Sequence, residues 1–328
     1  MMAYLKKNQV HIYLLLVIAG LASLAVIPDW KSVGISVATV LSANVCFGRM
    51  FGSQTIGLIG SMLYAWCPYR CANVSLAWVL IPIVLWGMVS FYGETKTEKD
   101  TKGSWVILAV GLGLIPFISV TAFCVTAGAV ALFCCLMGKR SFCKEKIVII
   151  GKAIVVTLIV SGYPLVTRLS QLRDPMVTGS LIPENFRMSG AYFAQYFGLF
   201  TTSNAGVKYP EIGMGAAVLL LIFVYMWALF VGKIADSFGK KMLLWMLLLL
   251  WLGSNLFPWD LLQNKNMLFS VILALLQTPL KWLIPAYTVG VWIGCRVLQK
   301  VAESGEEKLY KGMVAATVLV AFVMFRLG

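Results

Sequence analysis

The sequence has 328 residues, of which 60% are hydrophobic and only 12% are charged, and its formal net charge is +14. A soluble fold could not cover so much apolar surface, and several apolar runs reach the length of a bilayer span, so the composition predicts an all-α, polytopic membrane protein. The basic excess fits loops on the cytoplasmic face in contact with anionic membrane lipids, and no nucleic-acid-binding motif is present.

The cysteine and histidine content argues against metal and hydrolase chemistry. His11 is the single histidine, and the eight cysteines lie almost entirely inside apolar runs. This pattern lacks zinc-ligand spacing and a disulfide framework, and one histidine cannot serve both a catalytic triad and a metal site. No glycine-rich phosphate loop is present. We therefore expect neither a metal nor a cofactor.

The first third of the chain predicts four spans, at residues 11–27, 32–47, 54–64 and 74–92. Lys6 and Lys7 precede the first span, and basic residues favour the cytoplasmic side, so the N-terminus is predicted to be cytoplasmic. Asp29 then falls in a short outer turn between the first two spans. A mixed-charge loop, GETKTEKDTKG, follows the fourth span on the inner side.

The apolar stretch 104–137 is too long for one crossing at about 1.5 Å per residue. Pro116 lies near its middle and predicts two short helices that form a hairpin through the membrane. The basic segment GKRSFCKEK, at residues 138–146, is predicted to be cytoplasmic and to lead into a span at 147–163.

Residues 164–211 form the largest polar segment, and counting crossings places it outside the cell. A long loop in a compact protein is usually functional or disordered, and the aromatic run AYFAQYFGLF argues against disorder. Its aromatic residues recur at helical spacing, so we expect a short interfacial helix near residues 189–200 that lies on the membrane or covers a cavity.

The C-terminal part predicts spans at 212–231, 242–256, 284–298 and 312–325, with basic residues in the inner turn around Lys240. The prediction is a single integral membrane domain, residues 1–328, of about ten to twelve helices. Whether residues 267–298 cross the membrane once or twice is left open.

Residues 256–283, LFPWDLLQNKNMLFSVILALLQTPLKWL, organise this part of the chain. Pro258 and Pro279 bracket an apolar run of only about half the ~20 residues that a spanning helix needs. Trp259 and Trp282 are predicted to lie at the membrane–water interface. The pattern predicts a broken helix, which proteins tolerate at membrane depth where protein or a wet cavity covers it.

Three stretches together carry a family resemblance: LYAWCPYR at 63–70, FPWDLLQ at 257–263 and QTPLKWL at 277–283. Their order and spacing resemble those of the YfhO-like bacterial membrane proteins, also labelled 6-pyruvoyl-tetrahydropterin-synthase-related. The resemblance implies a transmembrane helical bundle of the GT-C glycosyltransferase type. The implied role is cell-envelope or lipid-linked sugar modification.

The resemblance also implies a polyprenyl-phosphate sugar as the donor, an outward-facing carboxylate that assists transfer, and basic groups that offset the donor phosphate. Asp260 and Asp29 are the candidate carboxylates. The candidate phosphate-binding side chains are Lys281, Arg168, Arg173 and Arg70. In the alternative interpretation, Asp260 caps the helix after Pro258 and Lys281 extends to the surface.

The departures from the family point to a shortened or inactive relative. The family's acidic N-terminal loop has no counterpart, no charge follows the PYR stretch, and Lys281 stands where the family has arginine. Two other functions therefore stay open: a non-catalytic scaffold or partner subunit in the membrane, and a transporter of a lipid or amphiphile, for which a broken helix is typical.

Overall fold

The computed structural model describes residues 9–24, 30–94, 103–197, 212–263 and 266–327. Within these ranges the chain is helical, and the one contact of β type is an isolated bridge between Ala191 and Ser254. The predicted all-α class is therefore confirmed. The α-helices are α2 (Gln9–Leu24), α3 (Trp30–Phe51), α4 (Gln54–Ala65), α5 (Pro68–Ala72), α6 (Ala77–Phe91), α7 (Ser104–Leu114), α8 (Val120–Met137), α9 (Lys144–Gln171), α10 (Pro175–Leu181), α11 (Ala216–Phe230), α12 (Ser237–Gly253), α13 (Met267–Leu276), α14 (Leu283–Glu303) and α15 (Glu307–Leu327). The 3-10 turns are η2 (Ile115–Phe117), η3 (Gly138–Arg140), η4 (Arg187–Ser189), η5 (Phe193–Tyr196), η6 (Trp259–Leu261) and η7 (Pro279–Trp282).

Three of the described helices are long and apolar enough to cross a membrane: α3, α8 extended by η3, and α9. A fourth candidate is the pair formed by α13 and the segment Pro279–Glu303, which is bent by 63°. Shorter apolar helices, among them α6 and α11, accompany them. These helices are consistent with association with a membrane.

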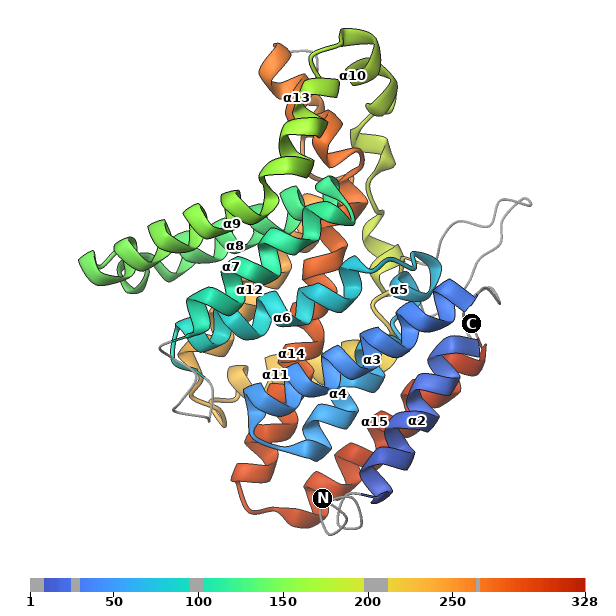
Figure 1. The fold of residues 1–328 in the computed structure, drawn as a ribbon. Coiled ribbons are helices and arrows are strands. Elements are labelled where there is room, and N and C mark those ends of the chain that lie inside the picture. Colours follow the sequence, from blue (N-terminus) through green and yellow to red (C-terminus); the bar gives the residue numbers. More distant parts are fainter. Residues whose placement is uncertain (1–8, 25–29, 95–102, 198–211, 264–265, 328) are drawn as a thin grey trace.

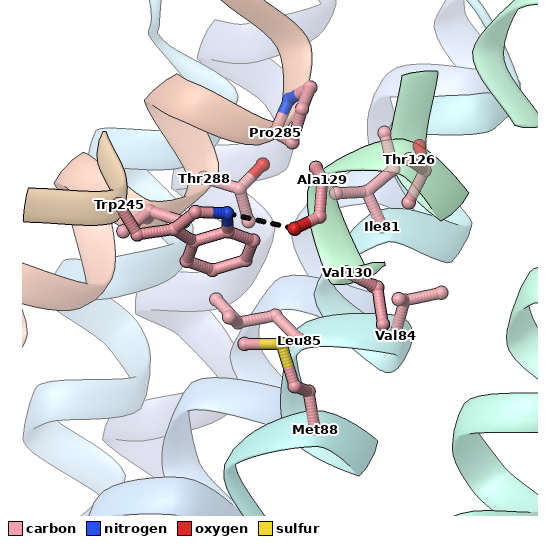
Figure 2. A pocket seen from close by; sticks show the side chains of 11 residues that line it. Ile81, Val84, Leu85, Met88, Thr126, Ala129, Val130, Trp245, Pro285 and Thr288 are labelled. Atoms are coloured by element: carbon pink, nitrogen blue, oxygen red, sulfur yellow. Dashed lines mark hydrogen bonds between the residues drawn. The ribbon is translucent and has the colours of Figure 1, made fainter. Parts of the chain in front are cut away.

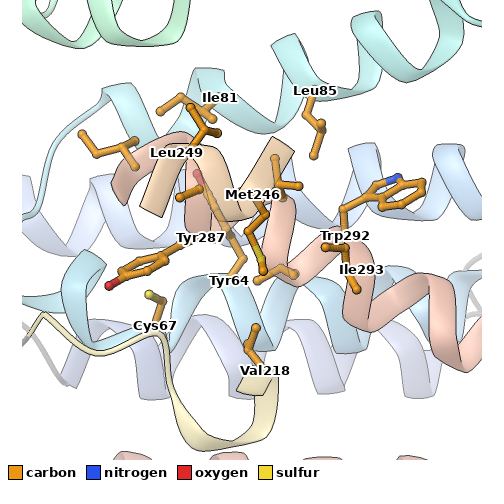
Figure 3. Close-up of a cluster of buried hydrophobic side chains, with 14 of the residues drawn as sticks. Tyr64, Cys67, Ile81, Leu85, Val218, Met246, Leu249, Tyr287, Trp292 and Ile293 are labelled. Atoms are coloured by element: carbon orange, nitrogen blue, oxygen red, sulfur yellow. The ribbon is translucent and has the colours of Figure 1, made fainter. Parts of the chain in front are cut away.

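Helix α14 is the centre of the bundle. Nearly every side chain from Leu283 to Leu298 is buried, on all sides of the helix. A helix that is apolar all round belongs inside a protein, and α14 packs against α4, α6, α11 and α12. Figure 3 shows the aromatic rings of Tyr287 and Trp292 among side chains from these neighbours. Gly60 of α4 allows the close approach, because a Cβ there would lie 2.9 Å from the Cys295 sulfur.

The helices α7, α8 and α9 extend away from this centre (Figure 1). The predicted break at Pro116 is confirmed, since Pro116 lies in η2 and the Ser119 side chain caps the start of α8. The predicted start of the long loop at residue 164 is wrong. Helix α9 continues through Pro164 to Gln171, because one proline removes a single helical hydrogen bond and the rest of the ladder continues.

Ion pairs join three turns at one end of the bundle. Arg140 of η3 contacts Glu94 at the end of α6, and Arg296 of α14 contacts both Glu94 and Asp236, which precedes α12. The predicted topology requires the segments at 138–146 and around 231–241 to lie at the same end, and these contacts place them there.

Candidate functional site

The broken span contains an unusual turn. Gln277 follows α13 with φ 60° and ψ −47°, and the Thr278 N–H donates to the Leu276 carbonyl at 2.7 Å. This i to i+2 hydrogen bond at positive φ is the geometry of a classic γ-turn, which is rare and strained for a residue with a side chain. The Thr278 hydroxyl then accepts from the Leu280 N–H at 3.0 Å and starts η7, with Pro279 in its first turn.

Lys281 lies on η7, directly after the strained turn. Its side chain is half-buried, and within the described ranges no hydrogen bond or ion pair reaches its ammonium group. Its neighbour Trp282 is buried and packs against α8, where a Cβ at Gly128 would lie 3.0 Å from the indole. A half-buried cation without a partner at a helix break is a typical mark of a binding site in a membrane protein.

The motif at 63–70 reaches this turn through Tyr69. The Tyr69 hydroxyl donates to the Leu280 carbonyl at 2.9 Å, one residue before Lys281. Its ring is buried and makes edge contacts with Trp78 and Tyr287. Pro68 starts the short helix α5 that carries the tyrosine. Two of the three motifs that carry the family resemblance therefore meet at η7.

Arg70 follows Tyr69 but faces a different neighbour. Its side chain is fully buried, and the guanidinium donates to the Ser36 hydroxyl of α3 at 3.2 Å and to the Cys71 sulfur at 3.5 Å. Its Nε has no hydrogen-bond partner within the described chain. These contacts direct Arg70 towards α3, while Tyr69 reaches η7, so the contacts do not join Arg70 and Lys281 in one site.

The motif at 257–263 holds a segment of the chain, residues 183–197, which we call the strap. The Gln263 amide donates to the carbonyls of Pro183 and Glu184, and its oxygen accepts from the Phe186 N–H. The buried Phe186 ring makes an edge contact with Trp259 at 5.4 Å between centroids. Trp259 and Trp282 are both buried inside the protein, so they are not exposed anchors, and their position at the membrane–water interface stays a prediction.

Asp260 lies on η6 and pairs with a basic residue of the strap. Its carboxylate is 3.5 Å from the Arg187 guanidinium, and both side chains are about half exposed. Arg187 also donates to the Asn255 carbonyl at 2.8 Å. Asp260 makes no capping hydrogen bond at η6, so the alternative prediction that it caps this turn is wrong. Its carboxylate is not free either, because it is paired with Arg187.

The strap runs past η7. Turn η4, which carries Arg187, packs against η7, which carries Lys281. Further along, Ala191 forms two backbone hydrogen bonds with residues 253 and 255, and the Tyr196 hydroxyl donates to the Leu250 carbonyl at 2.7 Å. The short helix was expected near residues 189–200, of which 198–200 lie outside the described residues; between 190 and 197 the helical part is the 3-10 turn η5. Tyr196 of this turn is buried, whereas Phe193 and the preceding Tyr192 are exposed.

The remaining predicted residues lie elsewhere. Arg168 is on α9 and donates to the side chain of Gln171 in the same helix at 3.1 Å. Arg173 is exposed between α9 and α10. Asp29 lies outside the described residues. Of the six candidates, Asp260 is linked to the turn of Lys281 through Arg187, since η4 packs against η7, and the hydrogen bonds of the other described candidates do not bring them to this turn.

A small cavity lies between α6, α8, α12 and α14, and Figure 2 shows its lining. Its polar atoms are already bonded. Thr126 and Thr288 donate to carbonyls of their own helices, and the Trp245 indole donates to the Ala129 carbonyl. No charged side chain lines it, so the cavity itself offers no acid or base.

Within the described residues no cluster of histidine, cysteine, aspartate or glutamate could hold a metal ion. Comparison of the chain with family models, curated proteins and solved structures gave no match. The site is therefore interpreted from its own geometry, and the clearest feature of that geometry is Lys281 at the strained turn.

Proposed function

We propose that this chain is a multi-pass cell-membrane protein, similar to GT-C glycosyltransferases, that binds the phosphate of a polyprenyl-linked sugar at η7. The N-terminus would be cytoplasmic and η7 would face outward. The observation that carries the proposal is Lys281, a half-buried ammonium group without a partner in the described chain. It lies on a turn held by two of the motifs that resemble the family.

The charges around η7 fit a phosphate ligand. The ammonium group of Lys281 can donate three hydrogen bonds to phosphate oxygens. Arg187 lies on η4, which packs against η7, and its pair with Asp260 is exposed. An exposed ion pair contributes only about 0–1 kcal/mol, so a phosphate could compete with Asp260 for this guanidinium. The ligand would then be held by two cations from different segments.

A second candidate function is a non-catalytic partner subunit that presents the lipid-linked sugar to another protein. The state of Asp260 favours the partner subunit. This carboxylate is already paired with Arg187, and it would have to give up that pair before it could act as a base. The apolar lining of the cavity favours it as well. The two candidates share the binding step and differ in whether a sugar is transferred.

Binding can be tested with the full chain in lipid nanodiscs. Native mass spectrometry would measure retention of undecaprenyl phosphate against two competitors: uncharged undecaprenol and the anionic phospholipid phosphatidylglycerol. Lys281→Gln should weaken retention about tenfold, the usual scale for losing a charge-assisted hydrogen bond. Lys152→Gln is the matched control, because Lys152 is an exposed lysine of α9.

The outcomes separate the candidates. Transfer of the sugar from a glycosylated undecaprenyl phosphate to an added hydroxyl acceptor or to water, with release of undecaprenyl phosphate, would favour the enzyme. Binding without this transfer would favour the partner subunit. Wild-type retention of undecaprenyl phosphate no stronger than that of undecaprenol would overturn the proposal. Equal loss in the Lys281 and Lys152 variants would also contradict it, since binding would then follow overall charge.

A further inference from the structure

The hydrogen bond from Tyr69 is the external anchor of η7. Within the described residues, no other side chain from outside segment 277–283 makes a hydrogen bond to the backbone of this turn. The turn begins at the strained Gln277, and strained backbone persists only where its surroundings fix it. The anchor acts on the Leu280 carbonyl, which belongs to the peptide group that joins Leu280 to Lys281.

Tyr69 is itself rigidly held. It is 2% exposed, and its ring contacts Trp78 at 6.1 Å and Tyr287 at 5.6 Å between centroids, both edge-on. The next residue, Arg70, is tied to Ser36 of α3. The hydroxyl of Tyr69 is thus a fixed donor, and its position is set by three other helices.

We propose that Tyr69 is a positioning residue that sets the place of the Lys281 ammonium group. The proposal rests on the function proposed above, in which Lys281 binds phosphate. The Leu280 carbonyl belongs to the peptide group that leads into Lys281, so the hydrogen bond from Tyr69 holds the backbone from which the Lys281 side chain starts. The motif at 63–70 therefore acts on the ligand through Lys281 and does not touch the ligand itself.

Tyr69→Phe removes the hydroxyl and keeps the ring. Its matched control is Tyr64→Phe, because the Tyr64 hydroxyl is similarly buried and also donates to a backbone carbonyl at 2.9 Å, but to that of Trp78 in α6 and not to η7. The first readout is acylation of Lys281 by an amine-reactive ester, measured by peptide mass spectrometry relative to Lys152 in the same molecule. This readout needs no ligand.

Tyr69→Phe should change the Lys281-to-Lys152 acylation ratio about threefold or more, the scale of one lost hydrogen bond, and Tyr64→Phe should leave it unchanged. The second readout is retention of undecaprenyl phosphate, which should fall about fivefold in Tyr69→Phe with Lys281 intact. An unchanged acylation ratio in Tyr69→Phe would overturn the proposal, as would an equal change in Tyr64→Phe.

The two proposals fail in different ways. A changed acylation ratio without any binding of undecaprenyl phosphate by the wild type would support the positioning role and overturn the proposed function. If Tyr69→Phe does not fold, Trp78→Phe takes its place, because without the indole the Tyr69 ring loses a support that keeps its hydroxyl at the Leu280 carbonyl. In that variant, an unchanged acylation ratio again overturns the proposal.

Discussion

Arg296 donates hydrogen bonds to both carboxylate oxygens of Asp236, with Nε 2.7 Å from one oxygen and Nη2 3.3 Å from the other. The Asp236 side chain is only 3% exposed, and it also accepts from the Tyr225 hydroxyl and from the Gly239 N–H at the start of α12. One carboxylate therefore joins α11, α12 and the central helix α14.

Removing this carboxylate should destabilise the fold. In Asp236→Asn the Arg296 guanidinium would be left buried without its main counter-charge, and breaking a buried pair typically costs about 3–5 kcal/mol. Thermal unfolding in detergent would measure the loss. Glu307→Gln is the control, because its pair with Lys311 is more than 70% exposed on both sides and should contribute less than about 1 kcal/mol. Equal losses in the two variants would contradict the prediction.

The same carboxylate predicts a pH dependence. Burial acts to raise the pKa of Asp236, but the hydrogen bonds from Arg296 and from the Gly239 N–H outweigh it and hold the pKa below its ordinary value of 3.8. An acid with a lowered folded-state pKa stabilises the protein above its unfolded-state pKa and loses that contribution as the pH falls through the folded-state value. The difference in stability between wild type and Asp236→Asn should therefore be constant from about pH 5 to 8 and shrink below about pH 4. A difference that grows on acidification would show the opposite sign.

Replacing Gln277 with glycine should not destabilise the protein, unlike glycine substitutions inside a helix. Its positive φ is costly for a residue with a Cβ, so Gln277→Gly should leave stability unchanged or raise it by up to about 1–2 kcal/mol. Gln277→Val should lower stability by about 1 kcal/mol or more, because a β-branched side chain tolerates this conformation least. Chemical denaturation of both variants checks the order. Greater stability of the valine variant would refute the γ-turn at this position.

Gln263 should control the accessibility of the strap. Gln263→Ala removes three hydrogen bonds to residues 183–186, so trypsin should cleave after Arg187 faster than in the wild type, by about tenfold. Asp260→Asn is the comparison, because it removes only an exposed pair with Arg187 and should change the rate less than threefold. Cleavage rates are read from the appearance of the two fragments. A larger effect of Asp260→Asn would show that the ion pair, and not Gln263, holds the strap.

The sequence predicted features that depend on local pattern. Pro116 and Pro279 lie at real breaks, because proline lacks a backbone donor and disfavours the helical conformation of the residue before it. The apolar run before Pro279 was predicted to be too short to span a membrane on its own. The structure agrees, because α13 ends at Leu276 after 10 residues. The all-α class followed from composition.

The features that the sequence did not predict depend on contacts between distant residues. Tyr69 and Leu280 are 211 positions apart, and Asp236 and Arg296 are 60 apart, so no local pattern pairs them. The sequence predicts a loop from Pro164 onwards and so places Arg168 in it, whereas α9 continues past this proline to Gln171. Tryptophan is the residue type expected at a membrane interface, so the sequence gives no sign that Trp259 and Trp282 are buried. Only their packing against Phe186 and α8 shows it.

The burial of α14 has a consequence for how the protein is made. This helix packs against α4 and α6, which are synthesised more than 180 residues earlier, and against α15, which comes after it. Until residue 303 has been synthesised, α14 cannot cover the side chains of α4, α6, α11 and α12 that surround it in the finished protein. The most tightly packed part of the finished protein is therefore completed only after nine tenths of the chain has been made.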